Sequence, residues 1–218
     1  MQVLKIPKEF EEGLVPRVLQ TTKLEPGLNS EIEIRFRSIR DKRGVTQSFY
    51  VQTLEFLEKF DAWEDKKDIE AVDYYYGNNL RSTHTIYPNR TEIKSIQKKR
   101  VGCKDITVTG NINVALVRIS HTTEEPIEPE VLVDLSLVRY KKRSSFVYKG
   151  WSYDLTKVWE GTVASEVKKR QLQSPPDQYE VEVEKIDSTQ YPSLDHLVVS
   201  LLLKAISILR PSDIVLSL

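Results

Sequence analysis

Three short segments place charged residues at every second position, the spacing that puts side chains on one face of a β-strand. They are EIEIRF at residues 31–36, RYKKRSS at 139–145 and EVEVE at 180–184. Their charged faces comprise Glu31, Glu33 and Arg35; Arg139, Lys141 and Arg143; and Glu180, Glu182 and Glu184. Like charges about 6.8 Å apart along such a face repel one another unless a counter-ion lies among them.

Two interpretations of these faces remain open. In the simpler one, each segment is a half-exposed strand whose charges face water and whose Ile or Val residues face the core. In the other, the faces line one barrel, where carboxylates hold a hard divalent cation and arginines and lysines hold a polyphosphate. A barrel of about eight strands has room for one small ligand. Because each buried unpaired charge is costly, ligands explain an interior of both signs better than folding does.

The elements that must position these residues are mostly strands. Between Ala71 and Glu184, short segments rich in Val, Ile, Thr and Tyr alternate with turn residues, a pattern that predicts about eight strands. We therefore expect a mainly β (α+β) fold, an antiparallel eight-stranded barrel with supporting helices, forming one domain over residues 1–218.

Apolar residues at helical spacing predict the supporting helices over residues 46–63 and 193–209. The first 30 residues indicate a leading segment with turns at Pro16 and at Pro26-Gly27. The basic run 168–170 indicates a solvated loop.

The composition narrows the class of protein. The 32 basic and 32 acidic residues give a net charge of zero, which argues against coating of nucleic acid through overall charge but not against a local anion site. A single cysteine, Cys103, excludes an internal disulfide and argues against a cysteine-based zinc site. The chain opens without an apolar signal sequence, and its most apolar stretch is too short to span a bilayer. We expect a soluble intracellular protein without a membrane partner.

Seven motifs in order carry a resemblance to a known family. They are EIEIRF, LRSTH, SIQKKRV, VRISHTTEEP, VRYKKRSSF, YDLTKV and YEVEVE, and together they span residues 31–184. The set resembles the RNA 5′-triphosphatases among the triphosphate tunnel metalloenzymes, the type that serves mRNA capping in fungi, protozoa and large DNA viruses. The resemblance is greatest to the capping enzymes of giant, mimivirus-like viruses.

The resemblance implies roles for individual residues. A Mg²⁺ or Mn²⁺ ion would be held by Glu31, Glu33 and Glu184, and by Glu182 directly or through water. The triphosphate would be bound, and its hydrolysis catalysed, by basic residues lining the tunnel: Arg81, Lys98, Arg118, Arg139, Lys141 and Arg143. Of the adjacent Lys98 and Lys99, which face opposite ways on a strand, Lys98 is assigned to the interior.

Four further residues receive less direct roles from the resemblance. Glu124 would orient the attacking water or accept its proton, unless it is only a loop carboxylate beside Pro126. Asp154 and Thr156 would support the basic strand from behind. Glu180 would either neighbour a metal ligand or pair with a tunnel arginine.

The implied reaction is hydrolysis of the γ-phosphate of 5′-triphosphate RNA, the first step of mRNA capping, with hydrolysis of NTPs in the presence of manganese. An inorganic or thiamine triphosphatase of the same fold, and a non-catalytic module that binds phosphate or RNA ends, remain alternatives. A guanylyltransferase domain in the same polypeptide would be a natural partner. The location would be a cytoplasmic virus factory or virion for a viral protein, and the nucleus for a cellular one.

Overall fold

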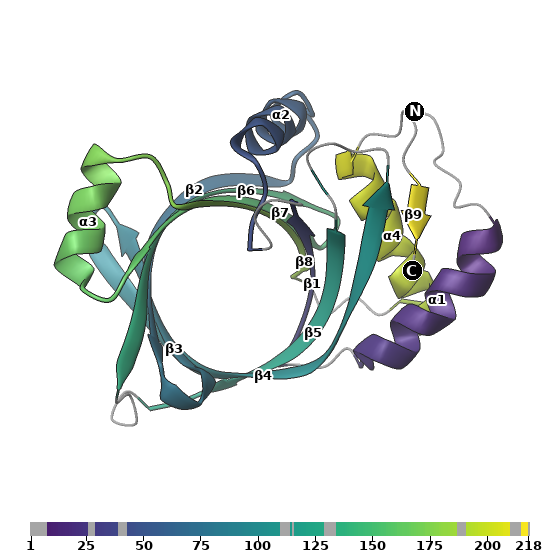
Figure 1. Ribbon diagram of the computed structural model, residues 1–218, viewed down its shortest axis with the longest axis horizontal. Helices are drawn as coiled ribbons and strands as arrows, with labels where there is room; N and C mark the ends of the chain where they lie inside the picture. The colour runs from purple at the N-terminus through teal and green to yellow at the C-terminus, as the bar shows by residue number, and fades with distance from the viewer. Residues whose placement is uncertain are drawn as a thin grey trace.

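Eight antiparallel strands close into a barrel, which Figure 1 shows end-on. The computed structural model describes residues 8–25, 29–38, 43–109, 114, 116–128, 134–186, 191–209 and 215–217. The barrel strands are β1 (Ser30–Arg37), β2 (Asp65–Tyr76), β3 (Leu80–Tyr87), β4 (Arg90–Thr109), β5 (Leu116–Pro126), β6 (Leu135–Tyr148), β7 (Trp151–Gly161) and β8 (Gln178–Lys185). Their spatial order is β3-β2-β6-β7-β8-β1-β5-β4, and pairing of β3 with β4 closes the ring. The predicted eight-stranded antiparallel barrel is thus confirmed.

Two short elements, a 3₁₀ turn and a ninth strand, adjoin the barrel strands. A 3₁₀ turn, η1 (Gly77–Asn79), joins β2 to β3, and its Asn78 and Asn79 take positive φ angles of 59° and 60°. Asparagine tolerates this left-handed conformation better than most residues do. Strand β9 (Val215–Ser217) pairs with the last residues of β4.

The hydrophobic core lies on the outer side of the barrel wall. The polar and charged side chains of the strands line the inside of the barrel. On β1, Ile32, Ile34 and Phe36 are buried in the main apolar cluster, whereas Glu31, Glu33 and Arg35 line the interior. Alternation along the strand produces this division, because successive side chains point to opposite sides of the wall. The core is completed by helices that pack on the outer surface.

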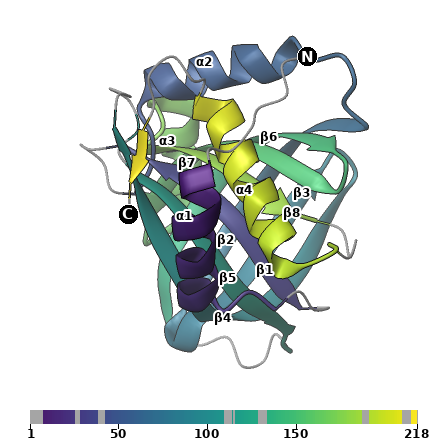
Figure 2. The ribbon, with the colours of Figure 1, turned by 90° about the vertical axis from the view of Figure 1, so that its right-hand side faces the viewer.

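Helix α4 (Leu194–Leu209) supplies much of this outer core, and it lies where the sequence predicted a helix. Ser193, the residue before the helix, caps its N-terminus: its Oγ accepts a hydrogen bond from the backbone N–H of His196 at 3.3 Å. Figure 2 shows α4 crossing the barrel wall beside α1 (Lys8–Thr22). None of the helices in the described part of the chain combines the length and apolar content needed to span a bilayer.

Helix α1 shows that the turn predicted at Pro16 was wrong. A proline inside a helix removes one hydrogen bond and costs about 3 kcal/mol. However, Leu14, Val15 and Val18 of α1 are buried in the main cluster. Burial of each such side chain contributes roughly 1.5–3 kcal/mol, so together they offset the proline. The turn predicted at Pro26-Gly27 lies outside the described residues.

A close approach fixes the end of α1 on the barrel. Strand β4 has a β-bulge between Arg100 and Gly102. A Cβ atom at Gly102 would lie 2.5 Å from the backbone oxygen of Thr21 in α1. Only a glycine leaves room for the helix at this point of the strand.

The remaining helices flank the barrel. Helix α2 (Gln47–Glu58) lies within the predicted range 46–63. Thr46 caps its N-terminus, because the Oγ1 of Thr46 accepts a hydrogen bond from the N–H of Phe49 at 3.2 Å. Helix α3 (Ala164–Gln173) contains the basic run 168–170, for which a loop was predicted wrongly. Its single buried residue, Val167, packs with Val138, Tyr140 and Trp159, and this contact secures an otherwise exposed helix.

Candidate active site

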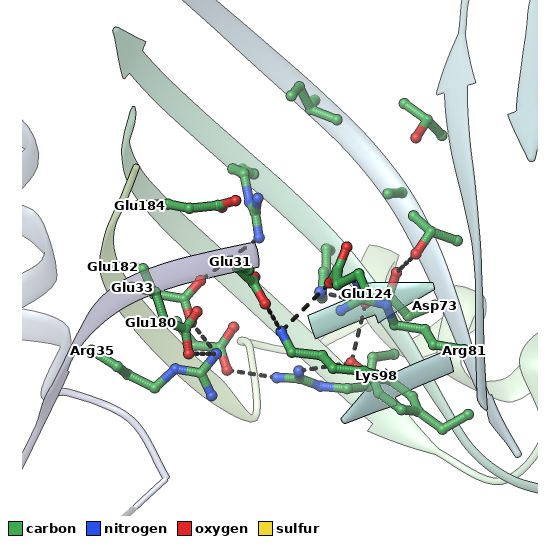
Figure 3. A pocket seen from close by; sticks show the side chains of 18 of the residues that line it. Glu31, Glu33, Arg35, Asp73, Arg81, Lys98, Glu124, Glu180, Glu182 and Glu184 are labelled. Atoms are coloured by element: carbon green, nitrogen blue, oxygen red, sulfur yellow. Dashed lines mark hydrogen bonds and ion pairs between the residues drawn. The ribbon is translucent and has the colours of Figure 1, made fainter. Parts of the chain in front are cut away.

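The barrel interior is a charged tunnel with a cavity of about 300 Å³, drawn in Figure 3. Its lining brings together most residues that the sequence singled out: Glu31, Glu33, Arg81, Lys98, Glu124, Arg139, Lys141, Arg143, Glu180, Glu182 and Glu184. Residues far apart in the chain meet here because seven strand pairings and the closing pairing of β3 with β4 wrap them around one space.

An acidic wall is formed by β1 and β8. Glu33 lies directly opposite Glu184 in the pairing of these strands. Hydroxyl groups on the neighbouring strand β5 orient two of the carboxylates: Ser120 donates to Glu33 at 3.0 Å, and Thr122 donates to Glu31 at 2.7 Å.

Within the acidic wall, nearby positive charge does not compensate the burial of the Glu184 and Glu33 carboxylates. Burial, with the charges of Glu31 and Asp154, raises the pKa of Glu184 to about 8. Burial also raises the pKa of Glu33, and the opposing charge of Arg35 does not cancel the effect. Glu182 behaves differently: although burial disfavours its charge, Arg35 and Arg143 lower its pKa to about 2.

These carboxylates fit a divalent cation. Oxygen donors are the ligands that Mg²⁺ and Mn²⁺ prefer, and the raised pKa values of Glu33 and Glu184 mark where a cation would relieve repulsion. Glu31 forms an ion pair with Lys98 instead. Accordingly, no three His, Cys, Asp or Glu side chains among the described residues are already arranged around one point as ligands.

A basic wall faces the tunnel from β6. Arg139 donates to Glu180 at 2.7 Å and to Glu160 at 2.9 Å. Lys141 forms an ion pair with Asp73 of β2. Of the two roles left open for Glu180, the structure therefore shows pairing with a tunnel arginine.

Arg143 is held from behind by β7. Its Nη1 donates to Asp154 at 2.9 Å, and its Nε donates to Thr156 Oγ1 at 3.1 Å. Asp154 in turn accepts from Ser152 at 2.6 Å. Asp154 and Thr156 are buried and outside the cavity lining, in the position of supports for the basic strand.

A mixed wall is formed by β3, β4 and β5. Arg81 donates to Glu124 at 2.9 Å, and Lys98 lies 3.6 Å from the same carboxylate. Lys94 lies 3.7 Å from the other oxygen of Glu124, so this carboxylate belongs to the tunnel and has three cationic neighbours. Lys99 points away from the interior and pairs with the exposed Glu125 at 3.2 Å.

Arg118 is the predicted phosphate-binding residue that the structure places apart. It lies opposite Arg35 in the pairing of β1 with β5 and so faces inward. Nevertheless, it is absent from the cavity lining and makes two hydrogen bonds to Asp105, at 2.6 and 2.7 Å.

Sequence reasoning missed the contribution of β2 and most of β3. Asp73 is almost fully buried, and although burial opposes its charge, Lys141 and Arg81 hold its pKa below the usual value. Thr83 of β3 donates to Asp73 at 2.8 Å. The feature of the sequence that could have identified Asp73 is its position two residues before Tyr75 in a strand. This spacing places the two side chains on one face of the strand.

Comparisons with known proteins agree with this geometry. Residues 73–195, more than half of the 218-residue chain, match the model of a family described as "mRNA capping enzyme, beta chain". The structure resembles that of Schizosaccharomyces pombe Pct1 RNA triphosphatase, with a TM-score of 0.66 and 18% identity, over 97% of this chain and 96% of that chain.

Two other solved structures share the fold. The RNA triphosphatase domain of a trifunctional mimivirus mRNA capping enzyme has a TM-score of 0.58 and 15% identity, over 96% of this chain and 100% of that chain. A chain of the S. pombe Mediator head module has a TM-score of 0.50 and 10% identity, over 86% of this chain and 99% of that chain. A search of curated protein sequences finds no match. At such identities the likeness shows a common fold, and the family match carries the functional information.

Proposed function

Because the chain belongs to the mRNA capping enzyme, beta chain family and is therefore an mRNA 5′-triphosphatase, we propose that it uses a divalent cation to release the γ-phosphate from the 5′-triphosphate end of RNA. The products are RNA with a 5′-diphosphate end and inorganic phosphate. We propose that the same site hydrolyses nucleoside triphosphates when manganese is present.

One observation carries the proposal. Acidic side chains of β1 and β8 and basic side chains of β6 line one cavity of about 300 Å³. A triphosphate with its cation supplies charges of both signs in one ligand, and it would complement both walls at once. Folding alone gives no reason to gather so many charges in a buried space.

The basic residues hold the substrate in this mechanism. Arg81, Lys141 and Arg143 donate hydrogen bonds to the phosphate oxygens, and the planar guanidinium groups suit that geometry. Glu124, fixed by Arg81, orients a water molecule toward the γ-phosphorus. The water oxygen forms a bond to phosphorus and gives a proton to the Glu124 carboxylate. The bond from phosphorus to the bridging oxygen breaks, and its electron pair leaves with the diphosphate end of the RNA. Positioning and electrostatics supply most of the rate in such reactions.

The acidic wall holds the cation. Glu33 and Glu184 would ligate it, together with Glu31 and, directly or through water, Glu182. A bound Mg²⁺ or Mn²⁺ would neutralise charge on the γ-phosphate oxygens and help to align them. Lys98, released from Glu31 as the cation binds, would then be free to contact the substrate.

Phosphate release from γ-labelled triphosphate RNA, with and without Mg²⁺ or Mn²⁺, tests the proposal. Release should require the cation and should fall at least about 10²-fold in Glu33→Gln, the loss typical of a key electrostatic contact. Metal-independent release would contradict the proposal.

An inorganic triphosphatase is the second candidate, because tripolyphosphate alone would satisfy both walls. Parallel assays with triphosphate RNA, tripolyphosphate and thiamine triphosphate separate the candidates. Turnover of tripolyphosphate without turnover of RNA would favour the inorganic activity. Binding of all three without turnover would indicate a non-catalytic module.

We further propose that residues 1–218 form one triphosphatase domain and that a guanylyltransferase is its functional partner. The solved mimivirus domain comes from a trifunctional capping enzyme, which supports such a link. The proposed locations are a virus factory or virion for a viral protein and the nucleus for a cellular one.

A further inference from the structure

The tunnel has two chemically different ends. Because neighbouring strands are antiparallel, the last residues of β1 and the first residues of β5 lie at the same end. Arg37 closes β1 there, and Arg118 lies near the start of β5. Arg100 of β4 pairs with Thr122, nearer the Glu31 end of β1, yet it is close enough to act electrostatically on Arg37. These three residues, Arg37, Arg100 and Arg118, are called the arginine rim.

Within the described part of the chain, the arginine rim carries more positive charge than the carboxylate of Asp105 balances. Arg118 lies directly opposite Arg35 on the paired strand, a placement that is destabilising for like charges. Arg118 donates two hydrogen bonds to Asp105, and Arg35 forms an ion pair with Glu182, so both of these carboxylates already have an arginine partner.

Of the residues in the arginine rim, Arg37 has the least favourable surroundings for its positive charge. Burial, together with the charges of Arg118 and Arg35, holds the pKa of Arg37 below its usual value. Its Nε is buried and has no hydrogen-bond partner within the described part of the chain. An anion at the rim would satisfy this donor and relieve the repulsion.

The other end of the tunnel offers a different surface. Ile69 of β2 and Thr85 and Tyr87 of β3 form an uncharged part of the cavity lining. Tyr87 is 41% exposed, with the Arg90 guanidinium 5.1 Å from its ring. This end suits a flat base better than a row of phosphates.

The size of the cavity requires the RNA to extend beyond it. A volume of about 300 Å³ lies at the small end of ligand pockets and is taken up by the triphosphate and its cation. The rest of the chain is a polyanion, and it should leave past the end that is rich in arginine.

We propose that the arginine rim binds the first phosphodiester of the RNA chain, beyond the triphosphate, and thereby gives the enzyme a preference for RNA over free nucleotides. This inference rests on the proposed function and adds the path of the RNA to it.

The test compares a nucleoside triphosphate with a 5′-triphosphate pentanucleotide in Arg37→Gln and Arg100→Gln. We expect kcat/KM for the pentanucleotide to fall roughly tenfold, the effect of losing one charge-assisted hydrogen bond. The value for the nucleoside triphosphate should stay within about twofold, since it has no phosphodiester. Lys99→Gln is the matched control, because Lys99 neighbours Arg100 in sequence but pairs with Glu125 away from the tunnel.

A binding measurement separates the rim from catalysis. Fluorescence anisotropy of a 5′-hydroxyl pentanucleotide without metal reports contacts to the chain alone. Arg37→Gln should bind more weakly, and the slope of log K against log salt should shrink by about 0.7, the value for one phosphate contact on a single strand.

Several results would overturn the inference. Equal loss with both substrates, or no loss with either, would remove the rim from RNA binding. Loss of the pentanucleotide preference in Tyr87→Ala, with the arginine variants unaffected, would place the RNA at the other end. If the wild type binds the pentanucleotide through Arg37 yet hydrolyses neither substrate, the proposed function fails and the rim stands.

Thermal unfolding distinguishes relief of charge repulsion from a role of Arg37 in stabilising the fold. Relief of repulsion predicts that Arg37→Gln unfolds at a slightly higher temperature than the wild type. A clear decrease would mean that Arg37 holds the fold together, and the inference would be wrong.

Discussion

Glu33 on β1 and Glu184 on β8 lie directly opposite each other, with both carboxylates facing the tunnel. Like charges in such a pair destabilise a sheet. The metal-free barrel therefore keeps a local repulsion at the position where a cation is proposed to bind, and this repulsion can be measured.

Glu184→Gln should decrease phosphate release at least about 10²-fold and stabilise the metal-free protein at alkaline pH. Burial raises the pKa of Glu184 to about 8. A raised folded-state pKa favours the protonated form, so the wild type loses stability as pH rises from its ordinary value near 4.5 through about 8. The variant does not titrate here, and its advantage in unfolding temperature should grow over that window.

Glu125→Gln is the control for this prediction, because Glu125 is an exposed carboxylate that pairs with Lys99 outside the tunnel. It should change neither property. An advantage of Glu184→Gln that shrinks as the pH rises would contradict the repulsion.

Thr156→Val should decrease kcat/KM for triphosphate RNA roughly tenfold, because Nε of Arg143 then loses its acceptor at 3.1 Å. Valine keeps the shape of threonine, so the effect isolates the hydrogen bond. Thr156→Ser retains the hydroxyl and should restore most of the activity. If serine and valine perform alike, Thr156 does not position Arg143.

Gly102→Ala should lower the free energy of unfolding by roughly 1–3 kcal/mol, the usual cost of overpacking. The added Cβ would lie 2.5 Å from the backbone oxygen of Thr21, and neither backbone segment can move freely. Urea unfolding measures the change. Gly13→Ala is the control, since a Cβ there meets nothing within 4 Å and alanine favours the helix. Equal stability of both variants would argue against the tight contact of α1 with β4.

Lys204→Met should stabilise the protein at pH 7. Lys204 lies 4.2 Å above the Trp151 ring, and burial lowers its pKa to about 8. Between pH 8 and the ordinary value near 10.5, the unfolded chain binds a proton that the folded protein does not, so wild-type stability rises with pH. The advantage of methionine should therefore diminish toward pH 10.5. Urea unfolding at pH 7 and pH 9.5 provides the comparison, and a constant difference would refute the role of burial.

The charged faces of β1, β6 and β8 were predictable because the charges of each face alternate along a single strand. Alternation in EIEIRF and EVEVE fixes the inward glutamates without knowledge of any partner strand. The same rule separates Lys98 from Lys99, which the structure places on opposite sides of the wall.

What depends on contacts between distant segments was not predictable. The surroundings of Arg118 depend on Asp105, whose register follows a bulge in β4. The role of Asp73 depends on Lys141, a partner 68 positions away that only the pairing of β2 with β6 brings near. Helix α1 was not predicted because Pro16 indicates a turn in the sequence. The helix is stabilised by packing on the barrel and not by the helix propensity of its residues.

The location of the hydrophobic core outside the barrel has an evolutionary consequence. Substitutions inside the tunnel change charge without disturbing the apolar contacts of Ile34, Val183 and Leu201 that hold the fold. Selection can therefore alter the chemistry of the interior and the stability of the scaffold separately. Such independence agrees with a fold that is retained at sequence identities of 18% and below.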